Sequence, residues 1–183
     1  WALTLLIIFS IIKIMQLNHE SVPFRNQEFP IILVCDTILF QPNIGSLFRI
    51  SEAFGVEKIL FLGIGNQMNP RKINKTSRST HLHVAHELFE TKETLSDYLT
   101  SNDFEIIALE ITSTSTPIQQ ITAPKDKKIA LLIGNEIDGI SDALLAIANQ
   151  TTHITMYGNN SSMNVVQATS IALYEISNQL NEI

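Results

Sequence analysis

Short runs of the sequence are apolar at every position instead of alternating between apolar and polar residues. The clearest are I-I-L-V-C at 31–35 and I-A-L-L-I at 129–133. A strand of this composition has both faces buried, which is typical of a parallel sheet covered by helices on each side. The predicted strands are 30–36, 58–63, 104–110, 128–134 and 153–156.

Between these runs, apolar residues recur at helical spacing. The predicted helices are 43–54, 91–100, 141–149 and 162–180, whereas 65–80 is expected to be irregular. Strands that alternate with helices predict an α/β fold with a mostly parallel sheet and helices on both faces. A length of 183 residues without an internal repeat suits one domain. We expect that domain at 29–183, after an N-terminal extension at 1–28.

The extension begins with the apolar run W-A-L-T-L-L-I-I-F-S-I-I. This run is too short to cross a bilayer, which needs about 20 residues. It also lacks the basic residues and the cleavage site of a signal peptide, although a truncated signal is an alternative. We expect no membrane association, a non-native segment at 1–14 and Met15 as the native start.

Charge and cysteine content narrow the functional classes. A net charge of −6 argues against a surface that coats nucleic acid, so any RNA contact needs a local basic patch. Such a patch is predicted at Arg71, Lys72, Lys75 and Arg78, where the alternative is a merely solvated loop. The single Cys35 cannot form an internal disulfide and suits a reducing, cytoplasmic location.

Polar residues follow several predicted strands, and ligands of such sheets bind outside the carboxyl ends of the strands. Asn43 and Arg49 follow the first strand, where a helix N-terminus with an arginine fork suits phosphate. Gly134 and Glu136 follow the fourth, where glycine lets a ligand approach the backbone. A helix cap, a surface arginine and an ordinary turn are the structural alternatives.

The stretch S-S-M-N-V-V-Q-A-T-S at 161–170 opens the last predicted helix. Ser and Asn are common N-caps, because their side chains accept hydrogen bonds from free N–H groups of the first turn. Capping would explain an isolated Ser-x-Asn. This stretch also follows a predicted strand, however, so a ligand-binding role competes with capping.

Two other patterns do not support a ligand site. G-I-G-N-Q-M at 63–68 lacks the last glycine of a dinucleotide fingerprint, which argues against NAD. H-L-H-V-A-H-E at 81–87 does not have the H-E-x-x-H spacing of a zinc site, and we expect no metal.

Three stretches, in this order, resemble the SpoU family of RNA 2′-O-ribose methyltransferases within the SPOUT superfamily. They are N-I-G-S-L-F-R-I-S-E-A-F-G, L-L-I-G-N-E-I-D-G-I-S and I-T-M-Y-G-N-N-S-S-M-N-V-V-Q-A-T-S-I-A-L-Y-E. The resemblance implies S-adenosylmethionine as methyl donor, a C-terminal trefoil knot and a homodimer that includes the last helix. The apolar residues of 162–180 also cover more of the helix circumference than a single core-facing stripe needs, which favours the dimer.

The resemblance also assigns site residues. The catalytic or near-catalytic set would be Asn43, Arg49, Glu136, Ser162 and Asn164. The cofactor-binding set, acting largely through backbone groups, would be Leu109, Glu110, Gly134, Ile154, Met156 and Met163. Thr155 stands where the family usually has proline, and Ser46 where Ala or Gly is common; both departures are mild.

The predicted function is S-adenosylmethionine-dependent 2′-O-methylation of a ribose in RNA. We expect tRNA rather than rRNA, because the sequence lacks an added N-terminal RNA-binding domain and stops soon after the last helix, as compact tRNA members do. The alternatives are an rRNA enzyme, a non-catalytic RNA-binding protein on the same fold and a nucleotide-binding α/β enzyme. Arg49 would act as the base in the family proposal, or would stabilise phosphate and a developing alkoxide, because guanidinium stays protonated in proteins.

Overall fold

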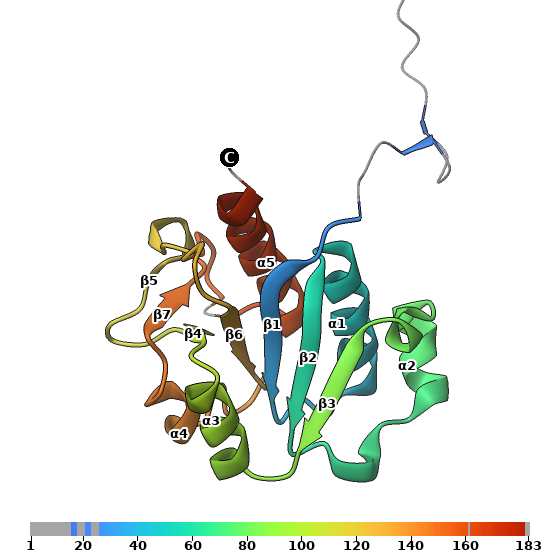
Figure 1. Cartoon of the computed structure of the whole chain (residues 1–183), viewed down its shortest axis with the longest axis horizontal. Helices are drawn as coiled ribbons and strands as arrows, with labels where there is room; N and C mark the ends of the chain where they lie inside the picture. Colours follow the sequence, from blue (N-terminus) through green and yellow to red (C-terminus); the bar gives the residue numbers. More distant parts are fainter. Residues whose placement is uncertain (1–15, 18–20, 23–25, 161, 182–183) are drawn as a thin grey trace, which may run out of the picture.

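The computed structural model describes residues 16–17, 21–22, 26–160 and 162–181, so the predicted non-native segment at 1–14 lies outside the described residues. Seven strands form one sheet in the order β3-β2-β1-β6-β4-β7-β5, and each neighbouring pair is parallel (Figure 1). The strands are β1 (Phe29–Asp36), β2 (Val56–Leu62), β3 (Ala85–Phe89), β4 (Glu105–Leu109), β5 (Thr116–Pro117), β6 (Ile129–Gly134) and β7 (Gln150–His153).

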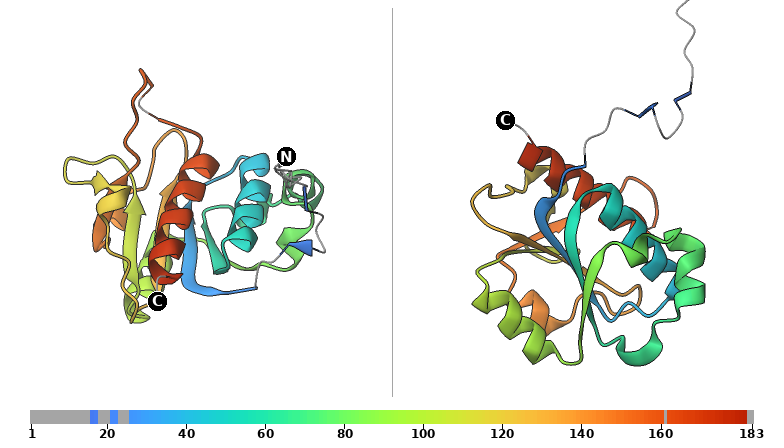
Figure 2. Two further views of the ribbon diagram at one scale, coloured as in Figure 1. Left: turned by 90° about the horizontal axis from the view of Figure 1, so that it is seen from above. Right: turned by 45° about the vertical axis from the view of Figure 1, so that its right-hand side comes forward.

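Helices cover both faces of this sheet, which confirms the predicted α/β class (Figures 1 and 2). One face carries α1 (Gln41–Ala53), α2 (Pro70–Ser77) and α5 (Val165–Asn181), and the other carries α3 (Lys92–Ser101) and α4 (Asp142–Leu145). No helix in the described part of the chain is long and apolar enough to cross a membrane.

The continuous apolar runs reflect two separate cores. Along β1, Ile31, Leu33 and Cys35 pack into the core beneath α1 and α5. Ile32 and Val34 pack into the core beneath α3 and α4. Side chains of a strand alternate between its faces, so only a strand covered on both sides needs an apolar residue at every position.

The last long strand was predicted at 153–156 and lies at Gln150–His153 instead. Thr152 is fully buried, and its hydroxyl donates to the carbonyl oxygen of Thr116 at 2.9 Å, so its polar group is satisfied inside the sheet. β-Branched threonine also favours strands. Ile154, which the sequence predicts within the strand, lies directly after β7 in the structure.

The strands β3 and β5 were not predicted. β3 pairs with β2 at the edge of the sheet, and four of its five residues are exposed. It therefore lacks the apolar run by which the central strands were recognised. β5 contains two residues, too few for a periodic pattern.

Two predicted helix boundaries were wrong. The helix predicted at 141–149 ends at Leu145, because the backbone and side chain of Asn149 hydrogen-bond Ile106 of β4 at 2.8 and 2.7 Å. The last helix begins at Val165 instead of 162. The stretch 65–80 is not irregular either, since it contains α2, whose start is marked by the Asn69 cap and Pro70.

Candidate active site at the carboxyl edge of the sheet

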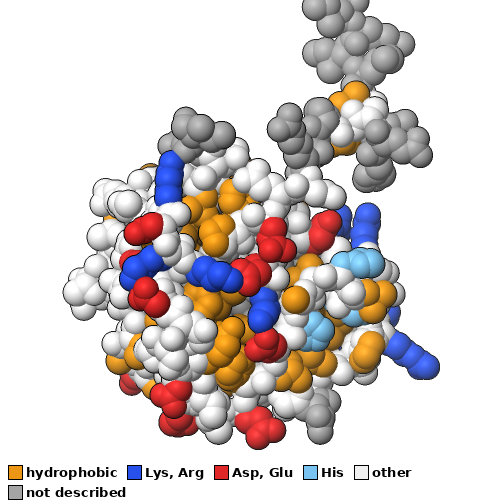
Figure 3. All heavy atoms as spheres, viewed as in Figure 1, with side chains coloured by type: hydrophobic (Ala, Val, Ile, Leu, Met, Phe, Trp, Pro, Cys, Tyr) orange, Lys and Arg blue, Asp and Glu red, His pale blue; other side chains and the backbone are white. Residues whose placement is uncertain are grey.

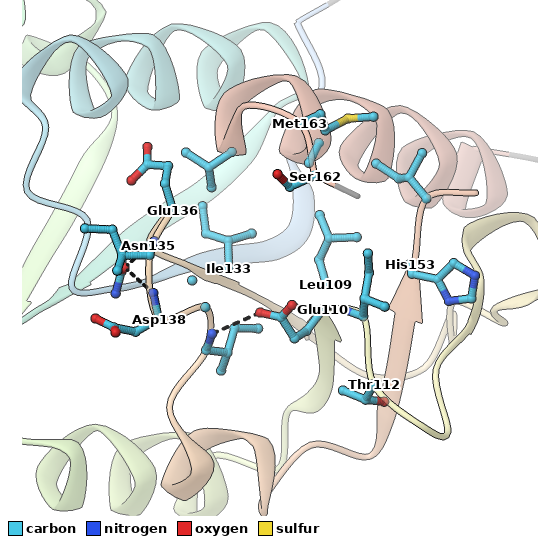
Figure 4. A pocket seen from close by; sticks show the side chains of 18 of the residues that line it. Leu109, Glu110, Thr112, Ile133, Asn135, Glu136, Asp138, His153, Ser162 and Met163 are labelled. Atoms are coloured by element: carbon cyan, nitrogen blue, oxygen red, sulfur yellow. Dashed lines mark hydrogen bonds between the residues drawn. The ribbon is translucent and has the colours of Figure 1, made fainter. Parts of the chain in front are cut away.

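A cavity of about 530 Å³ opens at the carboxyl ends of β4, β6 and β7 (Figure 4). Four segments line it, at 109–112, 133–145, 153–156 and 162–168. These segments include every residue predicted to bind the cofactor, namely Leu109, Glu110, Gly134, Ile154, Met156 and Met163. Segments far apart in sequence meet here because parallel strands end at the same edge of the sheet.

The loop that follows β6 folds tightly against the strand end. A Cβ atom on Gly134 would lie 2.0 Å from the carbonyl carbon of Gly139, so this approach requires glycine. The side-chain oxygen of Asn135 accepts hydrogen bonds from the N–H groups of Ile137 and Asp138, both at 2.9 Å. The loop backbone thereby faces the cavity in a defined conformation.

The cavity wall is acidic. Glu110, Glu136, Asp138 and Asp142 line it, and no Lys or Arg occurs among the lining residues within the described chain. Carboxylates of one sign in a concave site favour a cationic ligand and disfavour a pyrophosphate group. The wall therefore suits a sulfonium-bearing cofactor better than a dinucleotide.

Three residues of the predicted catalytic set contact one another beside the cavity. Asn43 is 7% exposed, and its side-chain amide donates to a carboxylate oxygen of Glu136. The amide of Asn164 donates to the side-chain oxygen of Asn43 at 3.3 Å. The oxygen of Asn164 also accepts from the N–H of Val166 at 2.9 Å. Asn164 therefore caps α5 and belongs to this network, so the two interpretations of the Ser-x-Asn stretch are compatible.

The remaining two residues of that set lie apart from this network. Ser162 lines the cavity just before α5 (Figure 4). Arg49 is exposed on α1 and is not a lining residue, and it has neither a hydrogen bond nor an ion pair with the described residues. Six positions separate it from Asn43, which places the two side chains on different sides of the helix.

The family model "SpoU rRNA Methylase family" matches residues 30–174. The chain belongs to this family. The resemblance drawn from the three motifs is thereby confirmed.

Curated relatives of this SpoU-family chain include enzymes that act on both kinds of RNA. It is 27% identical to the tRNA (guanosine(18)-2′-O)-methyltransferase of Aquifex aeolicus, over 83% of this chain and 71% of that protein. It is 24% identical to the 23S rRNA (guanosine(2553)-2′-O)-methyltransferase RlmP of Bacillus subtilis, over 79% of this chain. The match spans 57% of the Bacillus subtilis protein.

Solved structures share the SpoU fold. The Aquifex aeolicus TrmH/SpoU tRNA modifying enzyme superimposes with a TM-score of 0.75 at 25% identity, covering 86% of this chain and 78% of that chain. A structure described as giving insight into 2-OH methylation of C/U34 on tRNA has a TM-score of 0.74 at 22% identity. That match covers 85% of this chain and 100% of the other, and it supports the fold alone.

The predicted basic patch of this SpoU-family chain is the exposed side of α2. Its residues are all exposed: Arg71, Lys72, Lys75 and Arg78. Figure 3 shows Lys and Arg side chains projecting at the edge of the molecule where α2 lies in Figure 1. The structure therefore places the patch on and just after a short helix, whereas the sequence predicted a loop.

Helix α2 is held against α1, which carries Asn43 and Arg49. A Cβ atom on Gly45 would lie 2.1 Å from the hydroxyl of Thr76, so the two helices approach closely only because this residue is glycine. The Thr76 hydroxyl donates to the carbonyl oxygen of Pro42 at 3.1 Å. The basic patch is thus fixed relative to the helix that carries the catalytic candidates.

Histidine, cysteine and acidic side chains form no second site in the described part of the chain. No group of three or more His, Cys, Asp or Glu side chains suited to a metal occurs among the described residues. The histidines His81 and His86 contact the ring of Phe48 edge-on, and His81 also shares a hydrogen bond with Ser77 at 2.7 Å. Burial, and then the charge of Asp36, raises the pKa of the Cys35 thiol well above its ordinary value, which makes it a poor nucleophile.

Sequence reasoning missed Asp36 as a residue that contacts the loop after β6. It ends β1, is 2% exposed, and accepts a hydrogen bond from the N–H of Ser141 at 2.7 Å. The available signal was a charged residue at the end of a strand that is otherwise buried on both faces, because a buried charge requires partners.

Proposed function

We propose that this chain transfers a methyl group from S-adenosylmethionine to the 2′-hydroxyl of a ribose in RNA. The observation that carries the proposal is one cavity lined by all six predicted cofactor residues, with the Asn43–Glu136–Asn164 network at its side. Membership of the SpoU family supports the reaction type.

The cavity suits this cofactor in its charge and in the residues that line it. Leu109, Ile133 and Ile154 supply apolar wall for an adenine ring, and the close-packed loop after Gly134 presents its backbone. The acidic wall suits the positive sulfonium and ammonium groups. When bound, the cofactor supplies the electrophilic methyl group.

The protein residues would orient the ribose and stabilise charge. Asn43, itself held by Asn164, fixes the carboxylate of Glu136 at the cavity, so this group needs little reorganisation on substrate binding. Arg49, which lies outside the cavity, would fork an RNA phosphate next to the reacting ribose, and a phosphate oxygen would take the proton of the 2′-hydroxyl. Orientation of well-placed groups contributes on the order of 7 kcal/mol or more.

We favour tRNA as the substrate, with rRNA as the second candidate because the relatives named above act on one or the other. The exposed basic side of α2 supports contact with an RNA backbone. A C-terminal trefoil knot and a cytoplasmic location belong to the same proposal and rest on the family relation.

Cofactor binding tests the proposal most directly. We expect S-adenosylmethionine to bind with micromolar-class affinity in calorimetry. A cofactor concentration about 100 times Kd should stabilise the folded state by about 2.7 kcal/mol and raise Tm. NAD serves as the control, because the acidic wall disfavours its pyrophosphate. Absence of heat and of any Tm increase with S-adenosylmethionine would leave the RNA-binding alternative.

We also propose a homodimer with α5 in the interface. Ala172, Leu173 and Ile176 are buried within the subunit, so most apolar residues of α5 need no partner. Ile171 and Tyr174 remain 40% and 59% exposed on the opposite side.

Introducing charge on this side of α5 tests the dimer. Combining Ile171→Asp with Tyr174→Asp should convert the dimer to a monomer in light scattering, because charges would be buried without partners. Leu82→Asp with Leu88→Asp, at two exposed apolar positions outside α5, is the matched control and should leave the mass unchanged. A wild-type chain that is already monomeric at micromolar concentration would overturn the dimer.

A further inference from the structure

Two carboxylates flank the loop that follows β6. In the sheet, β6 lies between β1 and β4. Asp36 is the last residue of β1, and Glu110 directly follows β4. The two side chains therefore reach the 134–141 loop from the neighbouring strands on either side of it.

Each carboxylate accepts a hydrogen bond from one of two consecutive backbone N–H groups of this loop. Ser141 donates to Asp36 at 2.7 Å, and Ile140 donates to Glu110 at 3.0 Å (Figure 4 shows the second). The other oxygen of Asp36 accepts from the hydroxyl of Thr37 at 2.9 Å. The other oxygen of Glu110 accepts from the N–H of Ile111 at 3.0 Å.

The packing of the loop matches this arrangement. Gly139 has φ of +68°, and a Cβ atom there would lie 2.5 Å from a carboxylate oxygen of Glu110. Glycine is thus needed both for the backbone conformation and for the approach of the carboxylate. The same loop carries Glu136, whose carboxylate contacts Asn43 of α1.

We propose that Asp36 and Glu110 are positioning residues that clamp the 134–141 loop, and so hold Glu136 against Asn43 and shape the cofactor cavity. The inference rests on the proposed function for its catalytic consequence. Charged acceptors make stronger hydrogen bonds to N–H groups than neutral ones do, which explains why acidic side chains occupy both places.

The decisive variant is Glu110→Gln, because both oxygens of Glu110 accept from backbone N–H groups and glutamine replaces one acceptor with a donor. Amide hydrogen exchange of Ile140 should accelerate at least about 10-fold, and more than that of Ser141, since Ile140 donates to Glu110 and Ser141 donates to Asp36. S-adenosylmethionine affinity should fall by a similar factor. The matched control is Glu105→Gln at the amino end of the same strand, where the carboxylate accepts from Gln150 at 2.8 Å.

Asp36→Asn provides a second variant of nearly the same shape, in case Glu110→Gln does not fold. It should accelerate exchange at Ser141 more than at Ile140, which a general loss of stability would not do. Unchanged exchange at both amides in either folded variant, with wild-type cofactor affinity, would overturn the clamp. If the wild-type chain bound no S-adenosylmethionine, the proposed function would fail, while hydrogen exchange would still decide the clamp.

Discussion

Arg49→Ala is expected to nearly abolish methyl transfer, lowering its rate at saturating RNA and cofactor by about 100-fold to 1000-fold. Arg49 is exposed, has no hydrogen-bond or ion-pair partner in the described chain and does not line the cavity, so its removal should leave the fold and the cofactor site intact. The loss would come from the phosphate next to the reacting ribose, which arginine would no longer hold in place. Single-turnover transfer of a labelled methyl group, with calorimetry for cofactor affinity, measures both quantities.

Arg49→Lys is the matched control for this experiment. Lysine keeps the positive charge but cannot form the planar two-donor contact of arginine with phosphate. We therefore expect a smaller loss of rate than with alanine and the same cofactor affinity. Wild-type transfer by Arg49→Ala would make Arg49 an ordinary surface residue.

Neutralising the exposed side of α2 is expected to weaken RNA binding without a comparable loss of turnover at saturating RNA. The variant combines Arg71→Gln, Lys72→Gln, Lys75→Gln and Arg78→Gln. Each lost phosphate contact makes the negative slope of log K against log salt shallower by about 0.7 to 0.9, so the four together should make it shallower by about 3. Filter binding of RNA over a range of salt concentrations gives the slope.

A control variant removes the same number of charges elsewhere. It combines Lys58→Gln, Lys92→Gln, Lys127→Gln and Lys128→Gln. Lys58, Lys127 and Lys128 form ion pairs with carboxylates outside α2. Because net charge changes equally in both variants, only a local contact makes the slope shallower in one and not in the other. Equal slopes in the two variants would mean that the basic patch makes no specific contact with RNA and is only solvated charge.

Several features of this protein were determined by the sequence alone. Apolar residues at every position of β1 and β6 predicted a parallel sheet covered on both faces, because alternation of side chains leaves no other use for such a run. The rule that ligands bind at carboxyl ends then pointed to the residues after Leu109 and Ile133. The six cofactor residues that the family resemblance assigned line one cavity there.

Elements that depend on partners distant in sequence were not determined in this way. The buried residues of helix α2 are Ile73 and Ser77, and only the first is apolar. The helix therefore lacks the apolar stripe by which a helix is recognised in a sequence. Strand β3 is mostly exposed at the sheet edge, and β7 satisfies the buried hydroxyl of Thr152 through a neighbouring strand. A local pattern cannot report burial that another segment provides.

The same limit applies to the functional site, because the sequence motifs indicate its residues but not the contacts between them. The sequence indicated Asn43 and Glu136 as candidates, but only tertiary structure brings them into contact, since 93 positions lie between them. Only tertiary structure shows that Arg49 stands apart from them and that Asp36 holds the loop 105 positions further along the chain. Hydrogen bonds between strand ends depend on the order β1-β6-β4 in the sheet, and no local property of the sequence encodes that order.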